Sequence, residues 1–212
     1  QVEYSLICAA VMFLLWRNIG MTKPPRASQR HKGGSLRIDC TSSYKGLLAG
    51  LVILVFTFVV LIINLISISE RDALTEAVSY SSHYYFCLLY TAMMGLLMSA
   101  FHQMRHFLFM AQDAEQGVMF LDDLLLFVGM VGEIMIAVLY TGYIFLVETS
   151  FQVLQIYNCF SRCAQVLLQT AFILVSQRLV AHTKALQSSK PGRNLISFLI
   201  LANVSLFFTK ML

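Results

Sequence analysis

The sequence predicts an all-α membrane protein, a bundle of helices that cross the bilayer several times. Of its 212 residues, 58% are hydrophobic and only 12% are charged, much less charge than a soluble domain of this size carries. Long apolar stretches also recur along the chain, each close to the roughly 20 residues that a spanning helix needs. These stretches are continuous rather than alternating, which favours helices over the strands of a membrane β-barrel.

Six such stretches follow one another from the first residue to the last. The second, GLLAGLVILVFTFVVLIINLISI, is the cleanest because it contains no charge. The first starts at the beginning of the given sequence, which has no initiating Met, so we expect it to be cut short and the chain to be a fragment. The predicted spans are Val2–Trp16, Gly46–Ile68, Tyr84–Met110, Leu121–Val147, Ser150–Leu179 and Leu195–Leu212.

The connections between these spans differ in charge. The connection from Arg17 to Lys45 holds seven basic residues and one acid, and the one after the fifth span is basic without an acid. The connections on the other side hold one base between them. Because basic loops stay in the cytosol, we expect residues 17–45 and 178–194 to be cytosolic and the first residue to be extracellular.

The fourth and fifth spans each carry a charge near the middle, which is unusual because a charge there costs at least ~2.5–3.5 kcal/mol. Glu133 and Arg162 are 14 and 12 residues from the short turn between these spans. At 1.5 Å per residue both lie roughly 18–21 Å below it. The sequence therefore predicts a Glu133–Arg162 contact, which is either a structural ion pair or a titratable carboxylate in a hydrated path.

The fifth span also carries a polar stripe. Gln165 and Gln169 are four residues apart and share a face with Arg162, while Gln155 and Asn158 approach this face from one end. Such a stripe has to face protein or water rather than lipid. Its side chains either hold neighbouring helices together through hydrogen bonds or line a polar path.

Other polar residues are less informative. Glu3 fits a solvated helix end, and Asn203 in the last span can bond a neighbouring helix. His102 and His106 have the spacing of metal ligands, but no further ligands lie nearby in the sequence. We find no motif of an enzyme or of a nucleic-acid-binding protein. We therefore expect no catalysis, no metal and no cofactor, with sterol or other lipid at helix or dimer interfaces.

Four stretches carry motifs of a known family. The first is EYSLICAAVMFLLWRNIG (Glu3–Gly20), which is similar to a helix that ends in a Trp-Arg/Lys-Asn-Ile/Val-Gly signature. The others are KGLLAGLVILV (Lys45–Val55), LDDLLLFVGMVGE (Leu121–Glu133) and LANVSLF (Leu201–Phe207). With these stretches the chain resembles the otopetrin family of proton channels, although Phe207 stands where that family usually has Trp.

The resemblance implies a twelve-helix fold in two six-helix halves, and a homodimer. Residues 1–20 would then be the last helix of the N-terminal half, 21–45 a cytosolic basic linker and 46–212 a C-terminal half without its final helix. The resemblance also implies an intramembrane role for Glu3, in place of a solvated end. It also implies a functional role for four further residues: Glu133, Gln165, Gln169 and Asn203. Arg162 departs from the family, which usually has an apolar residue at this position.

The sequence and the resemblance together predict a proton-selective channel of the plasma membrane that extracellular acid opens. Protons would move between buried Glu, Gln and Asn groups and trapped water, so a narrow polar crevice would suffice. Two alternatives remain. A proton-coupled secondary transporter would use the same groups, with helices broken at positions such as Gly129, Gly132 and Gly142. A non-conducting membrane scaffold would use them only as structural pairs.

Overall fold

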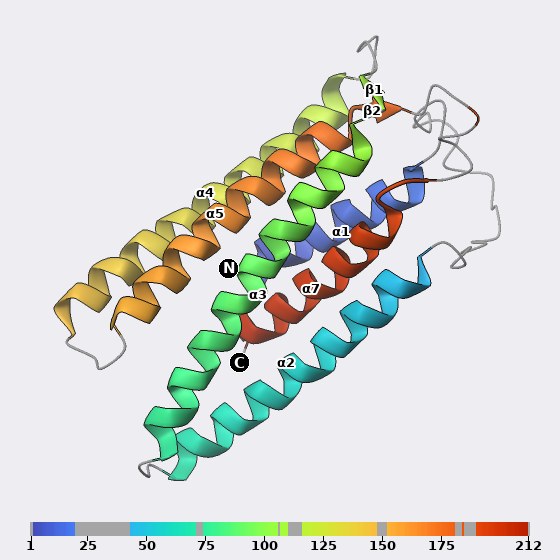
Figure 1. The fold of residues 1–212 in the computed structure, drawn as a ribbon. Coiled ribbons are helices and arrows are strands. Elements are labelled where there is room, and N and C mark those ends of the chain that lie inside the picture. The colour runs from blue at the N-terminus through green and yellow to red at the C-terminus, as the bar shows by residue number, and fades with distance from the viewer. Residues whose placement is uncertain are drawn as a thin grey trace.

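The computed structural model describes residues 2–19, 43–70, 74–105, 107–109, 116–147, 152–180, 184 and 190–211, and this part of the chain holds six long helices. Two two-residue strands accompany them. With the labels of Figure 1, the elements are α1 (Val2–Asn18), α2 (Tyr44–Glu70), α3 (Leu74–Met104), β1 (Leu108–Phe109), α4 (Gln116–Leu146), α5 (Gln152–Ser176), β2 (Leu179–Val180) and α7 (Arg193–Met211).

The helices form an elongated bundle in which successive helices run in opposite directions (Figure 1). α4 and α5 form an antiparallel hairpin, α3 packs against α5, and α2 packs against α7. α1 lies between these groups, in contact with α7, α4 and α5. The predicted all-α membrane bundle is confirmed. α2, α3, α4 and α5 are long and apolar enough to cross a membrane, whereas α1 and α7 are apolar but shorter.

Several predicted boundaries were wrong. α3 begins at Leu74 rather than Tyr84 and ends at Met104 rather than Met110. Likewise α5 already ends at Ser176 rather than Leu179, whereas the predicted fourth span agrees closely with the apolar part of α4, Asp123–Leu146. The apolar pattern marks only the part of a helix that suits the bilayer interior, whereas backbone hydrogen bonds continue the helix through polar residues.

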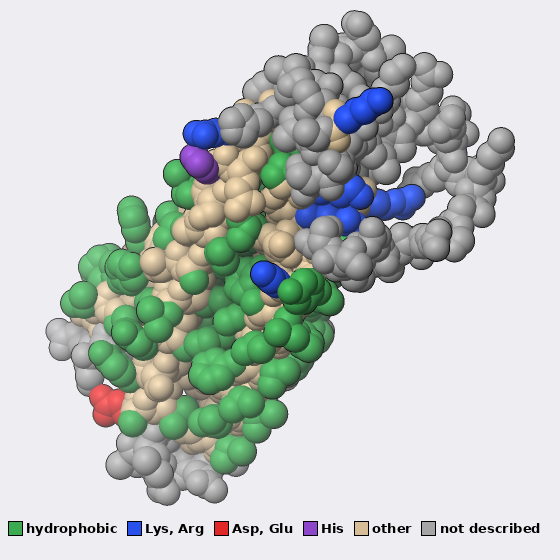
Figure 2. All heavy atoms as spheres, turned by 45° about the vertical axis from the view of Figure 1, so that its right-hand side comes forward, with side chains coloured by type: hydrophobic (Ala, Val, Ile, Leu, Met, Phe, Trp, Pro, Cys, Tyr) green, Lys and Arg blue, Asp and Glu red, His purple; other side chains and the backbone are tan. Residues whose placement is uncertain are grey.

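One end of the bundle gathers the basic side chains. The last residues of α1, α3 and α5 all lie at this end (Figure 1), which agrees with the shared side that the charge pattern predicted. There β1 and β2 pair antiparallel, with Leu108 opposite Val180 and Phe109 opposite Leu179. Figure 2 shows Lys and Arg side chains at this end, an acidic side chain at the opposite end and hydrophobic side chains over the body between them.

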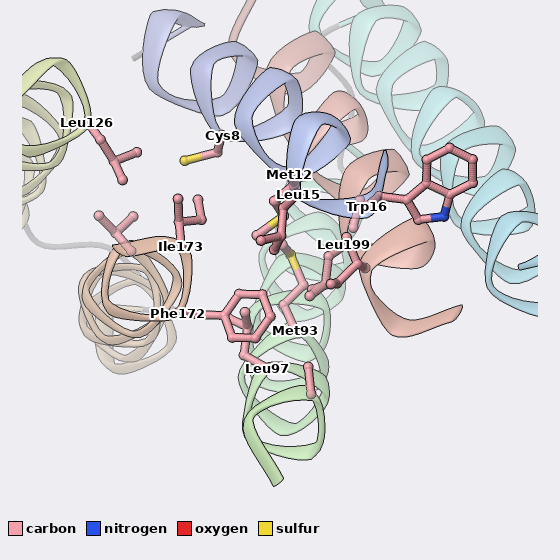
Figure 3. Close-up of a cluster of buried hydrophobic side chains, with 14 of the residues drawn as sticks. Cys8, Met12, Leu15, Trp16, Met93, Leu97, Leu126, Phe172, Ile173 and Leu199 are labelled. Carbon is pink, nitrogen blue, oxygen red and sulfur yellow. The ribbon is translucent and has the colours of Figure 1, made fainter. Parts of the chain in front are cut away.

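The core lies between α1 and three later helices. Met12 of α1, Met93 and Leu97 of α3, Phe172 of α5 and Leu199 of α7 are all fully buried. Figure 3 shows their side chains converging between the four helices. The core thus joins α1 to helices that are distant from it in the sequence.

Two glycines let α2 approach α7 closely. A Cβ on Gly46 would overlap the backbone carbonyl oxygen of Asn194, and one on Gly50 would lie 2.8 Å from the Leu201 side chain. The two glycines are four residues apart and form a GxxxG motif, which allows membrane helices to pack backbone to backbone. The α2–α7 contact therefore depends on the absence of side chains here.

We expect Gly46→Ala to destabilise the protein by about 1–3 kcal/mol, because α2 and α7 would have to move apart. Gly142→Ala is the matched control, since a Cβ at this exposed position of α4 meets nothing within 4 Å. Thermal unfolding of the detergent-solubilised protein, followed by fluorescence-detected size-exclusion chromatography, would measure both variants. Equal melting temperatures for the two variants would contradict the close α2–α7 packing.

Candidate functional site

The three predicted amide residues form one buried cluster. Gln165 and Gln169 lie one turn apart on α5 and are 2% and 0% exposed, and Asn203 of α7 is 1% exposed. Gln165 Nε2 donates to Gln169 Oε1 over 2.5 Å, and Gln169 Nε2 donates to Asn203 Oδ1 over 2.9 Å. The sequence predicted the polar stripe on α5, and the structure adds that the stripe meets Asn203.

The cluster also reaches α1. Asn203 Nδ2 donates to the backbone oxygen of Leu199 over 2.8 Å and lies 3.7 Å from Met12 Sδ. Met12 and Leu199 belong to the apolar core of Figure 3, so the amides are enclosed by hydrophobic side chains. In such surroundings each amide has to find its partner within the protein, because an unpaired polar group is costly there.

Glu133 of α4 and Arg162 of α5 form the predicted ion pair, with Arg162 Nη2 donating to Glu133 Oε2. The Glu133 side chain is 1% exposed and that of Arg162 is 16% exposed. The depth estimate from the sequence was therefore sufficient to bring these two residues together. The pair lies one helical turn before Gln165 on α5, so one helix carries both polar clusters.

A third polar contact was missed by sequence reasoning. The hydroxyl of Tyr4 on α1 donates to the backbone oxygen of Val166 over 3.0 Å and lies 2.8 Å from Thr170 Oγ1. The Tyr4 ring packs against α4, where a Cβ on Gly129 would lie 3.2 Å from Tyr4 Cδ2. A tyrosine inside an apolar span was a usable signal, because a buried tyrosine hydroxyl usually has a polar partner.

The remaining polar residues considered in the sequence lie elsewhere. The side chain of Glu3 and all of His106 fall outside the described residues. Asn158 Nδ2 donates to the His83 backbone oxygen over 3.5 Å, which connects α5 to α3 rather than to the amide cluster. Gln155 is buried nearer the other end of α5. Among the described residues, no group of three His, Cys, Asp or Glu side chains could hold a metal ion.

Comparison with known proteins agrees with these features. The family model described as Otopetrin matches residues 1–212. The chain belongs to the otopetrin family. The protein described as Proton channel OtopLc from Drosophila melanogaster is 29% identical over 216 residues, which cover 97% of this chain and 13% of that relative. This otopetrin chain thus spans a small part of the length of the relative it matches.

The arrangement of this otopetrin chain allows two kinds of chemistry. Glu133 can take up and release a proton, whereas the amides of Gln165, Gln169 and Asn203 can only donate and accept hydrogen bonds. A proton that passes the amides therefore needs water or a carboxylate as its carrier. The site thus combines one titratable group with a polar lining of neutral groups.

We expect Tyr4→Phe to lower the free energy of unfolding by about 1 kcal/mol, because the bond between α1 and α5 is lost. Tyr157→Phe, at a half-exposed position of α5, is the control and should be close to neutral. Thermal unfolding of the variants, combined with Thr170→Val in a double-mutant cycle, would measure the coupling. Purely additive effects of Tyr4→Phe and Thr170→Val would show that the two hydroxyl groups do not interact.

Proposed function

We propose that this otopetrin chain forms part of a proton-selective channel in the plasma membrane, opened by extracellular acid. The observation that carries the proposal is the set of buried polar side chains on α5, which meet Glu133 of α4 and Asn203 of α7 inside an apolar bundle. The Drosophila relative, which bears the name of a proton channel, supports the same function.

In this proposal Glu133 accepts and releases protons, and the amides of Gln165, Gln169 and Asn203 separate to admit the water that carries protons past them. A proton is the only cation that can move by exchange along hydrogen bonds, so a passage lined this tightly would exclude ions that keep a hydration shell. Glu3 is proposed as a further acid of this pathway because of the family resemblance.

We propose that the basic end of the bundle faces the cytosol. Arg17, Lys45, Arg105 and Arg178 lie at or next to the helix ends found there, and this supports the orientation by the positive-inside rule. The first residue would then be extracellular, and residues 17–45 and 178–194 would be cytosolic. The basic side chains at this end of the bundle would also contact anionic lipid head groups.

The outward faces of α2 and α4 carry many large exposed apolar side chains. We propose that they contact lipid, sterol, the rest of a twelve-helix fold or a second copy of the protein. In this arrangement residues 1–20 are the last helix of the N-terminal half. Residues 21–45 link the two halves in the cytosol, and residues 46–212 belong to the C-terminal half.

A secondary transporter is less well supported. That alternative expected helices broken near mid-membrane, whereas α4 continues as one helix from Gln116 to Leu146 through Gly129, Gly132 and Gly142. A non-conducting scaffold would explain the buried pairs but would give no current. Whole-cell recording of the full-length protein during an extracellular pH drop distinguishes the three: a channel gives a large inward current, a transporter a small one and a scaffold none.

We expect Glu133→Gln to reduce the acid-evoked current at least tenfold, because glutamine keeps the shape of the side chain but cannot take up a proton at these pH values. Surface biotinylation would show whether the variant reaches the membrane in normal amounts. A normal current at normal surface expression would remove Glu133 from the pathway.

We expect Gln169→Leu to reduce the current as well, because it removes the central amide between Gln165 and Asn203. The matched control is Gln103→Leu, the same substitution at an exposed position near the end of α3. Currents would be compared at equal surface expression. If both variants conducted like the unmodified protein, the amide cluster would only hold helices together and would not belong to the proton pathway.

A further inference from the structure

The contact between Arg162 and Glu133 uses only one nitrogen of the guanidinium group. Arg162 offers five N–H groups, yet only Nη2 donates to Glu133, and its buried Nε has no hydrogen-bond partner among the described residues. A guanidinium kept purely for structure usually uses its fork to bond a carboxylate with two nitrogens. Here the arginine instead supplies one charge at one carboxylate oxygen.

Glu133 has several titratable neighbours from the helices around it. Tyr4 of α1, Tyr90 of α3 and Cys163 of α5 lie within electrostatic reach of Glu133. Cys159, also on α5, donates to the Ala137 backbone oxygen, one turn after Glu133 on α4. These phenol and thiol groups are ordinarily neutral near pH 7. Arg162 thus sets a formal positive charge in direct contact with this carboxylate.

We propose that Arg162 is a positioning residue that sets how acidic the extracellular solution must be before Glu133 takes up a proton and the channel conducts. The inference rests on the proposed function and adds which residue sets the pH range in which the channel conducts. Arg162 itself carries no proton in this scheme and stays charged throughout.

The physical reason is the attraction between opposite charges in a medium of low dielectric constant, which stabilises the ionised carboxylate. One proton adds to a carboxylate oxygen of Glu133 and yields a neutral carboxylic acid, which still accepts a hydrogen bond from Arg162 through its other oxygen. The attraction between the two charges is then lost. The contact between α4 and α5 weakens at the level of the pair, one turn from Gln165.

The test is a titration of acid-evoked current against extracellular pH in the full-length protein. We expect Arg162→Leu to conduct at less acidic pH, with half-maximal current at a proton concentration at least about tenfold lower. Arg162→Lys should stay close to the unmodified protein, because one charged nitrogen is enough for the single contact. In the double variant Glu133→Gln/Arg162→Leu the pH shift should be absent, since its titrating group is gone.

Arg178→Leu is the matched control. Arg178 Nη2 also pairs with a carboxylate of α4, Asp123 Oδ2 at 3.1 Å, but this pair is solvent-exposed. It links α4 to the turn directly after α5 and should leave the pH of half-maximal current unchanged. A shift for Arg178→Leu as large as that for Arg162→Leu would show a general effect of loosening α4 from α5 and would overturn the proposal.

Two further outcomes separate the inference from the function on which it rests. Acid-evoked current in the unmodified protein with an unchanged half-maximal pH in Arg162→Leu would overturn the role of Arg162 and leave the channel function intact. No acid-evoked current in the unmodified protein at normal surface expression would overturn both. If Arg162→Leu does not reach the surface, Arg162→Gln replaces it, with the same expected shift.

Discussion

The need to pair every polar side chain inside an apolar bundle is the constraint on which this structure depends. Among the described helices α5 holds the most buried polar residues, and Arg162, Gln165, Gln169 and Thr170 all lie along it. Each finds a partner within the chain: one on α4, one on α7, one on α1 and one within α5 itself. Because the hydrophobic effect provides little driving force between helices in lipid, hydrogen bonds select the neighbours of α5 together with close packing.

The polar contacts of α5 explain the central position of α1. A short apolar helix with no partner preference could pack anywhere on the bundle, but the Tyr4 hydroxyl has to reach Thr170 and the Val166 backbone oxygen. Gly129 leaves room on α4 for the Tyr4 ring. Farther along α1, the Arg193 guanidinium stacks over the Trp16 ring at 4.0 Å, which ties α1 to the start of α7. Polar and cationic contacts therefore hold α1 at both ends.

The sequence was sufficient for features that follow from a single helix or one hairpin. The Glu133–Arg162 contact followed from counting residues from a short turn, because both helices rise 1.5 Å per residue. The contact of Gln169 with Asn203 did not follow, because it depends on how α7 packs against α5 across 34 residues of chain. Helix ends were missed because hydropathy reports the lipid-facing length, while α3 and α4 each begin several residues before the apolar stretch that the sequence marked.

The two polar clusters of α5 differ in what would allow a proton to pass. At 2.5 and 2.9 Å the bonds among Gln165, Gln169 and Asn203 leave no space for water between the amides. Because amides do not ionise near neutral pH, a proton can cross this cluster only after the amides separate and water enters. Glu133 needs no such separation, since it binds the proton itself. A proton on Glu133 removes the charge that draws α4 to α5, and the amides that would have to separate begin one turn farther along the same helix.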